Sequence, residues 1–360
     1  MPGMRWSGRW VCSGKWTIIL SAAVWSFGCS DGGPTPDGAS LGGTLLVTDR
    51  ASGSIAFVDL ATREEVGRVP VGEVIPHEVD VSPDGRMALT SEYGPNDDPG
   101  RHVILIDVAT ASAIARIDLG PDSRPHTALF LPDGRHAVAT MQDSDQLALI
   151  DLEAQAVVRT YATGGREGHI VRLSPDGSRA YVSSRLGDGT LSVIFLNEDR
   201  APVVIETGPG AEGIDVSADG SEVWVANRQV ETISVIDAES LEIVETLDSR
   251  RFTGRIEMGP DGFAISPNGG GGGGPVPQYL RLWDVESRSL LNEVPLTEEP
   301  RANAFGVLIH DGMAFVGDRG SGDLLMFDLA DLNDREVLMS DFGDPDGMAW
   351  TPVRVNAVTD

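Results

Sequence analysis

Three histidines occupy the same place in front of a repeated turn motif. His77, His126 and His169 each stand eight residues before the glycine that ends a Pro-Asp-Gly turn. Imidazole nitrogens hold zinc, copper or iron, and they also move protons near neutral pH. The spacing therefore predicts a ring of like-placed side chains in which these histidines are candidate metal ligands. The corresponding places elsewhere hold Glu212, Gly254, Ala304 and Asp346.

Four arginines form a second set of candidates, each at the end of a short, mainly apolar segment. A guanidinium group binds carboxylate or phosphate through paired hydrogen bonds. We therefore predict a ligand-binding site for an anion, built from these arginines together with Glu212 and Asp346. The arginines follow the letters VTD, VSS, VAN and VGD, and they are Arg50, Arg185, Arg228 and Arg319. Roughly matching places in the other repeats hold Tyr93, Gln142 and Asn268.

Both sets of residues have a structural alternative. A histidine before a strand can bond the backbone of a neighbouring repeat. An arginine at a strand end can pair with an adjacent acid, such as Asp49 or Asp318. Such a surface ion pair contributes little to the stability of the fold. The sequence leaves these alternatives open, so the question is whether the fold brings the side chains to one place.

The turn motif recurs along the chain and reveals internal repeats. Its glycines lie 42 to 50 residues apart, at Gly85, Gly134, Gly177, Gly220, Gly262 and Gly312. A second series of seven apolar segments runs alongside, and the fourth has Phe195 where the others end in aspartate. Those aspartates are Asp59, Asp107, Asp151, Asp237, Asp284 and Asp328. Seven segments indicate seven repeats.

Each repeat reads as four short strands without helical periodicity. Proline sets φ in the turn, aspartate bonds locally, and glycine takes the left-handed conformation that closes the hairpin. This pattern is typical of a β-propeller blade. We therefore predict an all-β, seven-bladed β-propeller with four-stranded blades. The first repeat lacks a first strand, and residues 345–351 resemble one, so we expect that C-terminal strand to complete blade 1 and close the ring.

The predicted fold brings the two sets of candidates together. In a propeller the first strand of each blade lies beside the central channel, and its start lies at the same end as the end of the second strand. The histidine ring and the arginines therefore share one channel mouth. Two long connections, residues 91–101 and 267–277, run from second to third strands and are expected at this mouth.

Several segments resemble the YVTN-type repeats of bacterial and archaeal surface-associated seven-bladed propellers. They include SPDGSRAYVSS (174–184) and SADGSEVWVANRQVETISVIDAESLEIVETL (217–247). The resemblance covers about residues 42–352, and blade 6 departs from it with a glycine tract. It implies the propeller fold but no single function, since related propellers include lactonases, the copper domain of nitrous oxide reductase and amine dehydrogenase chains.

The excess of acidic residues limits the classes of molecule that the protein is expected to bind. The chain has 55 acidic residues against 27 lysines and arginines, a net charge of -28. Such an excess repels the phosphate backbone, so we expect no nucleic-acid binding. We expect a protein or a small anionic ligand as partner, and a monomer.

The N-terminus reads as an export signal. Arg5, Arg9 and Lys15 precede an apolar run that ends at Cys29. We predict a lipoprotein-type signal peptide at residues 1–28, lipidation of Cys29, a flexible tether at 29–41 and one propeller at 42–360. An ordinary secretory signal is the alternative. The protein is thus expected to be exported and held in the bacterial cell envelope by a lipid anchor alone.

These observations favour an envelope-anchored, non-catalytic binding or scaffold propeller with a ligand or partner site at the channel mouth. Two alternatives remain. One is a channel-mouth enzyme with lactonase-like or lyase-like hydrolysis. The other is a redox-associated propeller that binds copper or zinc through His77, His126 and His169. A divalent metal is the one cofactor that the residues suggest, and they do not identify the ligand.

Overall fold

Blades 2 to 7 each contain the hairpin turn expected from the sequence. In the first of these turns, Ser82 Oγ and the Arg86 N–H both donate to Asp84 Oδ1, at 2.7 and 3.1 Å. Gly85 adopts a φ of 76°, which glycine reaches without the Cβ clash of other residues. The repeated aspartates at the ends of the third strands also shape turns, since Asp59 Oδ1 accepts the Ala61 N–H at 2.8 Å.

The computed structural model describes residues 41–356 except 73–74, 250–251, 269–276 and 297–304. The predicted signal peptide, the lipidation site Cys29, the tether up to residue 40, Ala304 and the glycine tract 269–274 lie outside the described residues. No helix in the described ranges is both long and apolar enough to cross a membrane.

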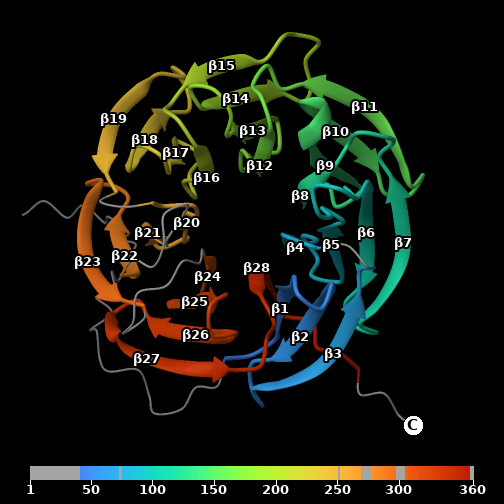
Figure 1. The fold of residues 1–360 in the computed structure, drawn as a ribbon, viewed down its shortest axis with the longest axis vertical. Helices are drawn as coiled ribbons and strands as arrows, with labels where there is room; N and C mark the ends of the chain where they lie inside the picture. The colour runs from blue at the N-terminus through green and yellow to red at the C-terminus, as the bar shows by residue number, and fades with distance from the viewer. Residues whose placement is uncertain (1–40, 73–74, 250–251, 269–276, 297–304, 357–360) are drawn as a thin grey trace, which may run out of the picture. The chain divides into compact units, whose positions relative to one another are not determined.

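The strands form seven antiparallel sheets of four strands, arranged around a central channel (Figure 1). Blades 1 to 3 contain, from the channel outward, β28 (Pro345–Thr351), β1 (Thr44–Asp49), β2 (Ser54–Asp59), β3 (Glu64–Pro70); β4 (Val79–Val81), β5 (Met87–Ser91), β6 (His102–Asp107), β7 (Ser112–Asp118); β8 (Pro125–Phe130), β9 (His136–Met141), β10 (Gln146–Asp151), β11 (Ala156–Ala162). A short 3-10 helix, η1 (Gln142–Ser144), follows β9.

The remaining blades repeat this order. Blades 4 to 7 contain β12 (Gly168–Leu173), β13 (Arg179–Ser184), β14 (Thr190–Phe195), β15 (Val203–Glu206); β16 (Ala211–Val216), β17 (Glu222–Asn227), β18 (Thr232–Asp237), β19 (Ile243–Asp248); β20 (Glu257–Met258), β21 (Phe263–Asn268), β22 (Tyr279–Asp284), β23 (Ser289–Pro295); β24 (Phe305–His310), β25 (Met313–Asp318), β26 (Asp323–Asp328), β27 (Asp331–Met339). The prediction of seven four-stranded blades is confirmed.

The C-terminal strand closes the ring as predicted. β28 pairs antiparallel with β1, so that Leu45 faces Trp350 and Val47 faces Met348. Figure 1 shows β28 innermost in blade 1, beside the N-terminal strand. Outside the ladder, Trp350 Nε1 donates to the Gly42 carbonyl at 2.9 Å. This pairing joins segments from the two ends of the described chain and completes the edge of blade 1.

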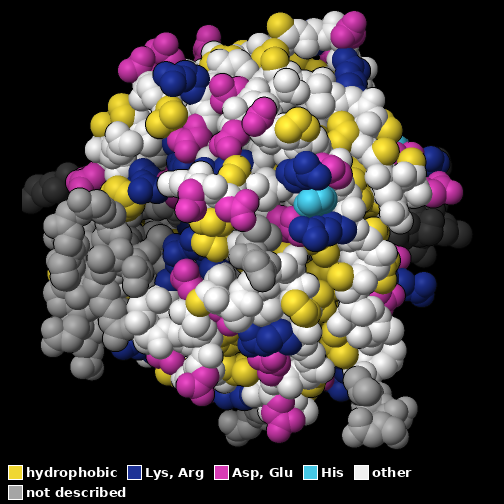
Figure 2. Space-filling model, turned by 45° about the vertical axis from the view of Figure 1, so that its right-hand side comes forward, with side chains coloured by type: hydrophobic (Ala, Val, Ile, Leu, Met, Phe, Trp, Pro, Cys, Tyr) yellow, Lys and Arg dark blue, Asp and Glu magenta, His cyan; other side chains and the backbone are white. Residues whose placement is uncertain are grey.

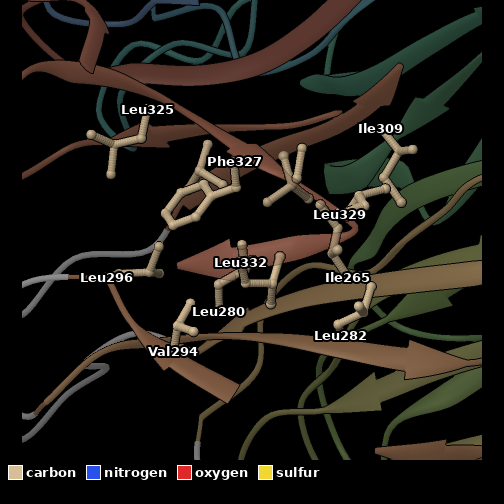
Figure 3. Packing of buried hydrophobic residues seen from close by; sticks show 13 residues of the cluster. Ile265, Leu280, Leu282, Val294, Leu296, Ile309, Leu325, Phe327, Leu329 and Leu332 are labelled. Carbon is tan, nitrogen blue, oxygen red and sulfur yellow. The ribbon is translucent and has the colours of Figure 1, made fainter. Parts of the chain in front are cut away.

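Apolar side chains pack between neighbouring blades. Figure 3 shows one such cluster between blades 6 and 7, in which Leu280 and Ile265 of blade 6 lie near Phe327 and Leu332 of blade 7. Leu280 and Phe327 are fully buried, and Leu332 is 1% exposed. Burying a leucine or phenylalanine side chain contributes about 1.5–3 kcal/mol. These contacts hold the blades at the spacing that the channel requires.

Replacing a leucine between the blades should destabilise the ring, while an outer leucine should tolerate the same change. We expect Leu280→Ala to lower the free energy of unfolding by about 2–5 kcal/mol, because it leaves a cavity in this cluster. Leu291→Ala in β23 is the control, since Leu291 is 51% exposed and should change stability by less than about 0.5 kcal/mol. Urea unfolding measures both. Equal losses in the two variants would contradict this account of the core.

Candidate functional site

A β-bulge stands near the start of the innermost strand in four blades. The ladder register shifts between Pro125 and Ala128 in β8, and equivalent shifts occur in β12, β16 and β28. A bulge inserts an extra residue and changes the direction in which a side chain points. The bulged segments carry His126, His169, Glu212 and Asp346. The predicted ring therefore coincides with a repeated backbone irregularity.

Hydroxyl groups from the preceding blade bind the backbone of four ring residues. In blades 1 to 4, a threonine or serine in the second strand donates to the backbone carbonyl of the ring residue in the next blade. The bonds run from Thr48 to His77 (3.0 Å), Ser91 to His126 (2.6 Å), Thr140 to His169 (3.0 Å) and Ser183 to Glu212 (2.7 Å). Blades 5 to 7 have Ala226, Pro267 and Gly317 at the matching place. One side of the ring is thus fixed more firmly than the other.

The three histidines form a row of tilted rings, called the histidine row below. The ring centroids of His77 and His126 lie 4.5 Å apart, and those of His126 and His169 lie 3.6 Å apart. Tyr93 stands edge-on to His77 and His126, at 4.5 and 5.1 Å. The fold therefore brings the predicted histidines together at one channel mouth.

A carboxylate lies at each end of the histidine row. His77 Nδ1 is 3.0 Å from Asp346 Oδ2, and His169 Nε2 is 3.9 Å from Glu212 Oε1. Burial opposes ionisation of Asp346, but Arg255, His77 and Arg319 outweigh it and hold the pKa of this carboxyl below its usual range. Asp346 is therefore an anion that faces the row.

The two buried histidines of the row, His126 and His169, are neutral. His126 is fully buried and His169 is 3% exposed. Burial lowers the pKa of His126 well below its ordinary value, and the adjacent His169 and His77 add to the shift. Burial also lowers the pKa of His169, together with Arg185 and Arg255. Both rings therefore keep one unprotonated nitrogen at neutral pH.

Gln142 determines which nitrogen of His169 carries the proton. Its Nε2 donates to Glu167 Oε1 at 3.2 Å, and an ionised carboxylate only accepts, so the amide orientation is fixed. The amide oxygen then accepts from His169 Nδ1 at 3.0 Å and from the Tyr93 hydroxyl at 3.2 Å. His169 Nε2 is consequently a lone-pair acceptor. His126 Nε2 is buried and has no hydrogen-bond partner among the described residues.

The four predicted arginines lie around the same mouth, each against a carboxylate. Arg185 donates to Glu167 at 2.8 Å, and Arg228 bonds Glu212. Arg319 and Arg50 both contact Asp344, at 3.2 and 3.3 Å, and Arg50 Nε is also 3.7 Å from Asp346.

The adjacent acids expected as structural partners are not the ones used. Asp49 binds Arg68 at 2.9 Å, and Asp318 accepts the Gly320 N–H at 2.8 Å. Asn268 pairs across its ladder where Asn227 does, one residue before the arginine position. The arginine side chains are 14–29% exposed and each lies against a carboxylate, so they stay partly accessible to solvent while the adjacent acids compensate much of their charge.

Sequence reasoning missed the arginine that links the two ends of the row. Arg255 NH2 lies 2.7 Å from Glu78 Oε1 and 3.4 Å from Asp346 Oδ1, and NH1 lies 3.8 Å from Glu212 Oε1. It follows the ring position Gly254 by one residue, and no other blade has arginine there. An arginine next to a ring position was the available signal.

The ring residues do not converge on one point. Among the side chains that the structure describes, no group of three or more His, Cys, Asp or Glu is placed to hold a metal ion. The assignment of a metal to His77, His126 and His169 therefore stays a prediction. What the mouth offers is a row of neutral imidazoles between two carboxylates, surrounded by guanidinium groups.

The fold and the site define a seven-bladed β-propeller with a polar channel mouth. A family model described as the Cytochrome D1 heme domain matches residues 134–259, from blade 3 to blade 6 and less than half of the chain. No curated protein matches the sequence. The resemblance to YVTN-type repeats stays a prediction.

Two solved structures share the fold. Hydrazine synthase of Kuenenia stuttgartiensis superposes with a TM-score of 0.61 at 17% identity, over 77% of this chain and 86% of that one. A functionally unknown protein of Desulfotomaculum acetoxidans DSM 771 superposes with a TM-score of 0.68 at 14% identity, over 87% of this chain and 100% of that one. At these identities the similarity is one of fold.

Because His126 and His169 are neutral in the folded protein, the free energy of unfolding should depend on pH. The unfolded chain takes up a proton on His126 below a pH of about 6.5, whereas the folded chain does not, so the free energy of unfolding should fall as the pH is lowered. The contribution of His126 is about 1.4 kcal/mol per pH unit well below that value. We expect His126→Gln to lose this part of the slope between pH 6.5 and 5, measured by urea unfolding.

The surface histidine His136, 30% exposed at its side chain, provides the matched control. His136→Gln should keep most of the wild-type slope between the same pH values. An unchanged slope in His126→Gln would show that the buried ring becomes protonated in the folded protein.

Proposed function

We propose that the protein is a non-catalytic binding propeller, anchored in the cell envelope, whose channel mouth holds a small anionic ligand. The observation that carries this proposal is the concentration of buried polar groups at the histidine row. A buried nitrogen without a partner, such as His126 Nε2, costs about 1–3 kcal/mol. The apolar clusters pack the blades together without these polar groups, so packing of the fold does not explain their burial. Departures of this kind from ordinary packing concentrate at functional sites.

An anionic ligand is supported by the donors around the row. Within the described part of the chain, the buried Nε atoms of Arg124 and Arg185 make no hydrogen bond. Arg185, Arg228 and Arg319 are also 22–29% exposed. Carboxylate or phosphate oxygens would accept from guanidinium groups that the local acids leave partly unused. Because the acids already neutralise much of this charge, we expect affinity to come from directed hydrogen bonds more than from attraction at long range.

Envelope anchoring is supported by the N-terminal sequence. The charged and apolar segments before Cys29, and the Gly- and Pro-containing residues that follow it, are typical of a lipidated export signal and a tether. Figure 2 shows acidic side chains scattered among arginines over one face of the propeller, with no continuous basic surface on that face. Such a surface favours solubility, with the lipid as the only contact with the membrane.

Haem does not fit the described residues. A haem needs an imidazole or other axial ligand beside room for a macrocycle. Here the imidazoles pack on one another, with ring centroids 3.6 and 4.5 Å apart, and none of them lines the cavity in the channel, so none has room for a macrocycle beside it. We therefore propose no haem chemistry for this chain, although the matching family model is named for a haem domain.

Metal binding by the histidine row is a second candidate function. It is favoured by the hydrogen bond from His169 Nδ1 to Gln142, which leaves Nε2 free to coordinate. Metal-binding histidines commonly donate their other nitrogen to such a partner. The buried, unpartnered Nε2 of His126 is adjacent. Small ring rotations would have to bring these nitrogens to about 2 Å from one ion.

The anion site can be tested by calorimetry on the purified full-length chain with citrate, inorganic phosphate and glucuronate as probes. We expect at least one probe to bind, and Arg185→Gln or Arg228→Gln to weaken it at least tenfold, about 1.4 kcal/mol. Arg159→Gln is the control, because Arg159 lies in the outer strand β11 and is 39% exposed. If none of the probes binds, or if the control is affected equally, the proposed anion site is wrong.

Metal binding is tested separately, by titrating Zn²⁺ and Cu²⁺ into the metal-free full-length chain. The second candidate predicts one ion per chain, and at least tenfold weaker binding in His126→Gln, since a ligand is lost. His136→Gln, which changes a histidine of β9 bound to Asp133 at 2.7 Å, should bind as the wild type does. Absence of stoichiometric metal after reconstitution would exclude this candidate.

A further inference from the structure

A cavity of 430 Å³ lies inside the channel and is separate from the histidine row. All seven innermost strands line it, and the histidines are not part of its wall. Six charged side chains face it, four carboxylates and two guanidinium groups. They are Glu78, Asp80, Asp215, Glu257, Arg172 and Arg255.

The carboxylates outnumber the guanidinium groups that neutralise them. Arg172 contacts Asp215 at 3.1 Å and Glu257 at 3.5 Å, and Arg255 contacts Glu78 at 2.7 Å. Asp80 instead accepts the Phe130 N–H at 2.8 Å. Two negative charges therefore remain uncompensated when all four carboxylates are ionised. The hydrogen bond between the Phe130 N–H and Asp80 joins blade 3 to blade 2. A neutral side-chain oxygen would accept this N–H equally well, so the bond does not require a negative charge at Asp80.

Burial in the cavity raises the pKa of two of the wall carboxyl groups. Burial raises the pKa of Asp80 to about 6. Burial, followed by the neighbouring carboxylate of Asp215, raises the pKa of Glu257 to about 8 against the opposing effect of Arg172. Near neutral pH these carboxyl groups therefore hold protons. Another cation could take the place of these protons and be stabilised by the same carboxylates.

The rest of the wall is apolar. It includes Phe130, Met258, Leu308, Met348 and Trp350. A pocket with an apolar wall and a few convergent charged groups suits an organic molecule with a charged end. A bare metal ion is less suited, because among the described residues no three acidic or histidine side chains are placed to hold one.

We propose that this cavity binds a small organic cation, an amidinium, guanidinium or primary ammonium group carried on an apolar body. The charged group lies against Asp80 and Glu257, and the body packs on the apolar wall. Binding then replaces protons on the wall carboxylates, with Glu78, Asp215, Arg172 and Arg255 as their charged neighbours. This site and the anion site at the mouth have Arg255 as a common neighbour, but they bind ligands of opposite charge through different residues.

Three probes of nearly equal shape test the proposal: benzamidine, which is cationic, benzamide, which is neutral, and benzoate, which is anionic. Calorimetry with the full-length chain at pH 8.5 should show benzamidine binding at least tenfold more tightly than benzamide, and no binding of benzoate in the cavity. Equal binding of benzamidine and benzamide, or no binding of benzamidine, would overturn the proposal. This comparison needs no variant, so a folding defect cannot obscure it.

The wall carboxylates are tested by substitution and by pH. Glu257→Gln should weaken benzamidine at least tenfold, whereas Glu336→Gln should not, since Glu336 is 41% exposed in the outer strand β27. Benzamidine affinity should rise from pH 6 to 8.5, because Asp80 and Glu257 lose their protons over this interval. Flat affinity across these pH values, or an unaffected Glu257→Gln, would place the cation elsewhere. Citrate binding at the mouth should be unchanged in Glu257→Gln.

Discussion

The pairing of β28 with β1 is the constraint on which the rest of the structure depends. It closes the ring, so that all seven innermost strands face one channel. It also supplies Asp346, which contacts His77, Arg50 and Arg255 and so joins the start of the histidine row to the arginines. The strand that closes the ring therefore also builds the mouth. This last strand, β28, places the carboxylate of Asp346 beside His77, the first histidine of the row.

The ring has seven structural positions but is chemically one-sided. Hydroxyl groups of blades 1 to 4 bind the carbonyls of the next blade's ring residue, and these carbonyls belong to the three histidines and Glu212. On the other side stand Gly254 and the second-strand residues Ala226, Pro267 and Gly317. A ligand at this mouth would meet a rigid half lined with imidazoles. In the second half of the mouth, Arg319 and Arg50 form ion pairs with Asp344.

Much of the fold follows from the sequence, because each blade is a local hairpin unit with its own turn signal. The turn glycines give the blade count, and a fixed offset from them locates the ring. Two partners of the arginines, Glu167 and Asp344, could not be found in this way. Glu167 and Asp344 lie two residues before ring positions, where the other blades share no residue type.

The charged wall of the cavity was missed for a related reason. Glu78 and Arg255 follow their ring positions by one residue, and Asp80, Arg172, Asp215 and Glu257 follow theirs by three. Other blades hold uncharged residues at the same two places, so the repeat pattern gives no signal that these side chains share a cavity. Burial and charge compensation at these positions depend on neighbouring blades, which only the closed ring brings together.

The position of Asp346 in the chain has a consequence for the order of folding. The pairing of β28 with β1 joins segments from the two ends of the described chain, and contacts between distant segments form slowly because the loop between them must close first. Blades 2 to 5 can form from local hairpins while the histidine row still lacks the carboxylate that faces His77. The histidine row therefore gains Asp346 only when β28 docks on β1, in the same step that closes the ring.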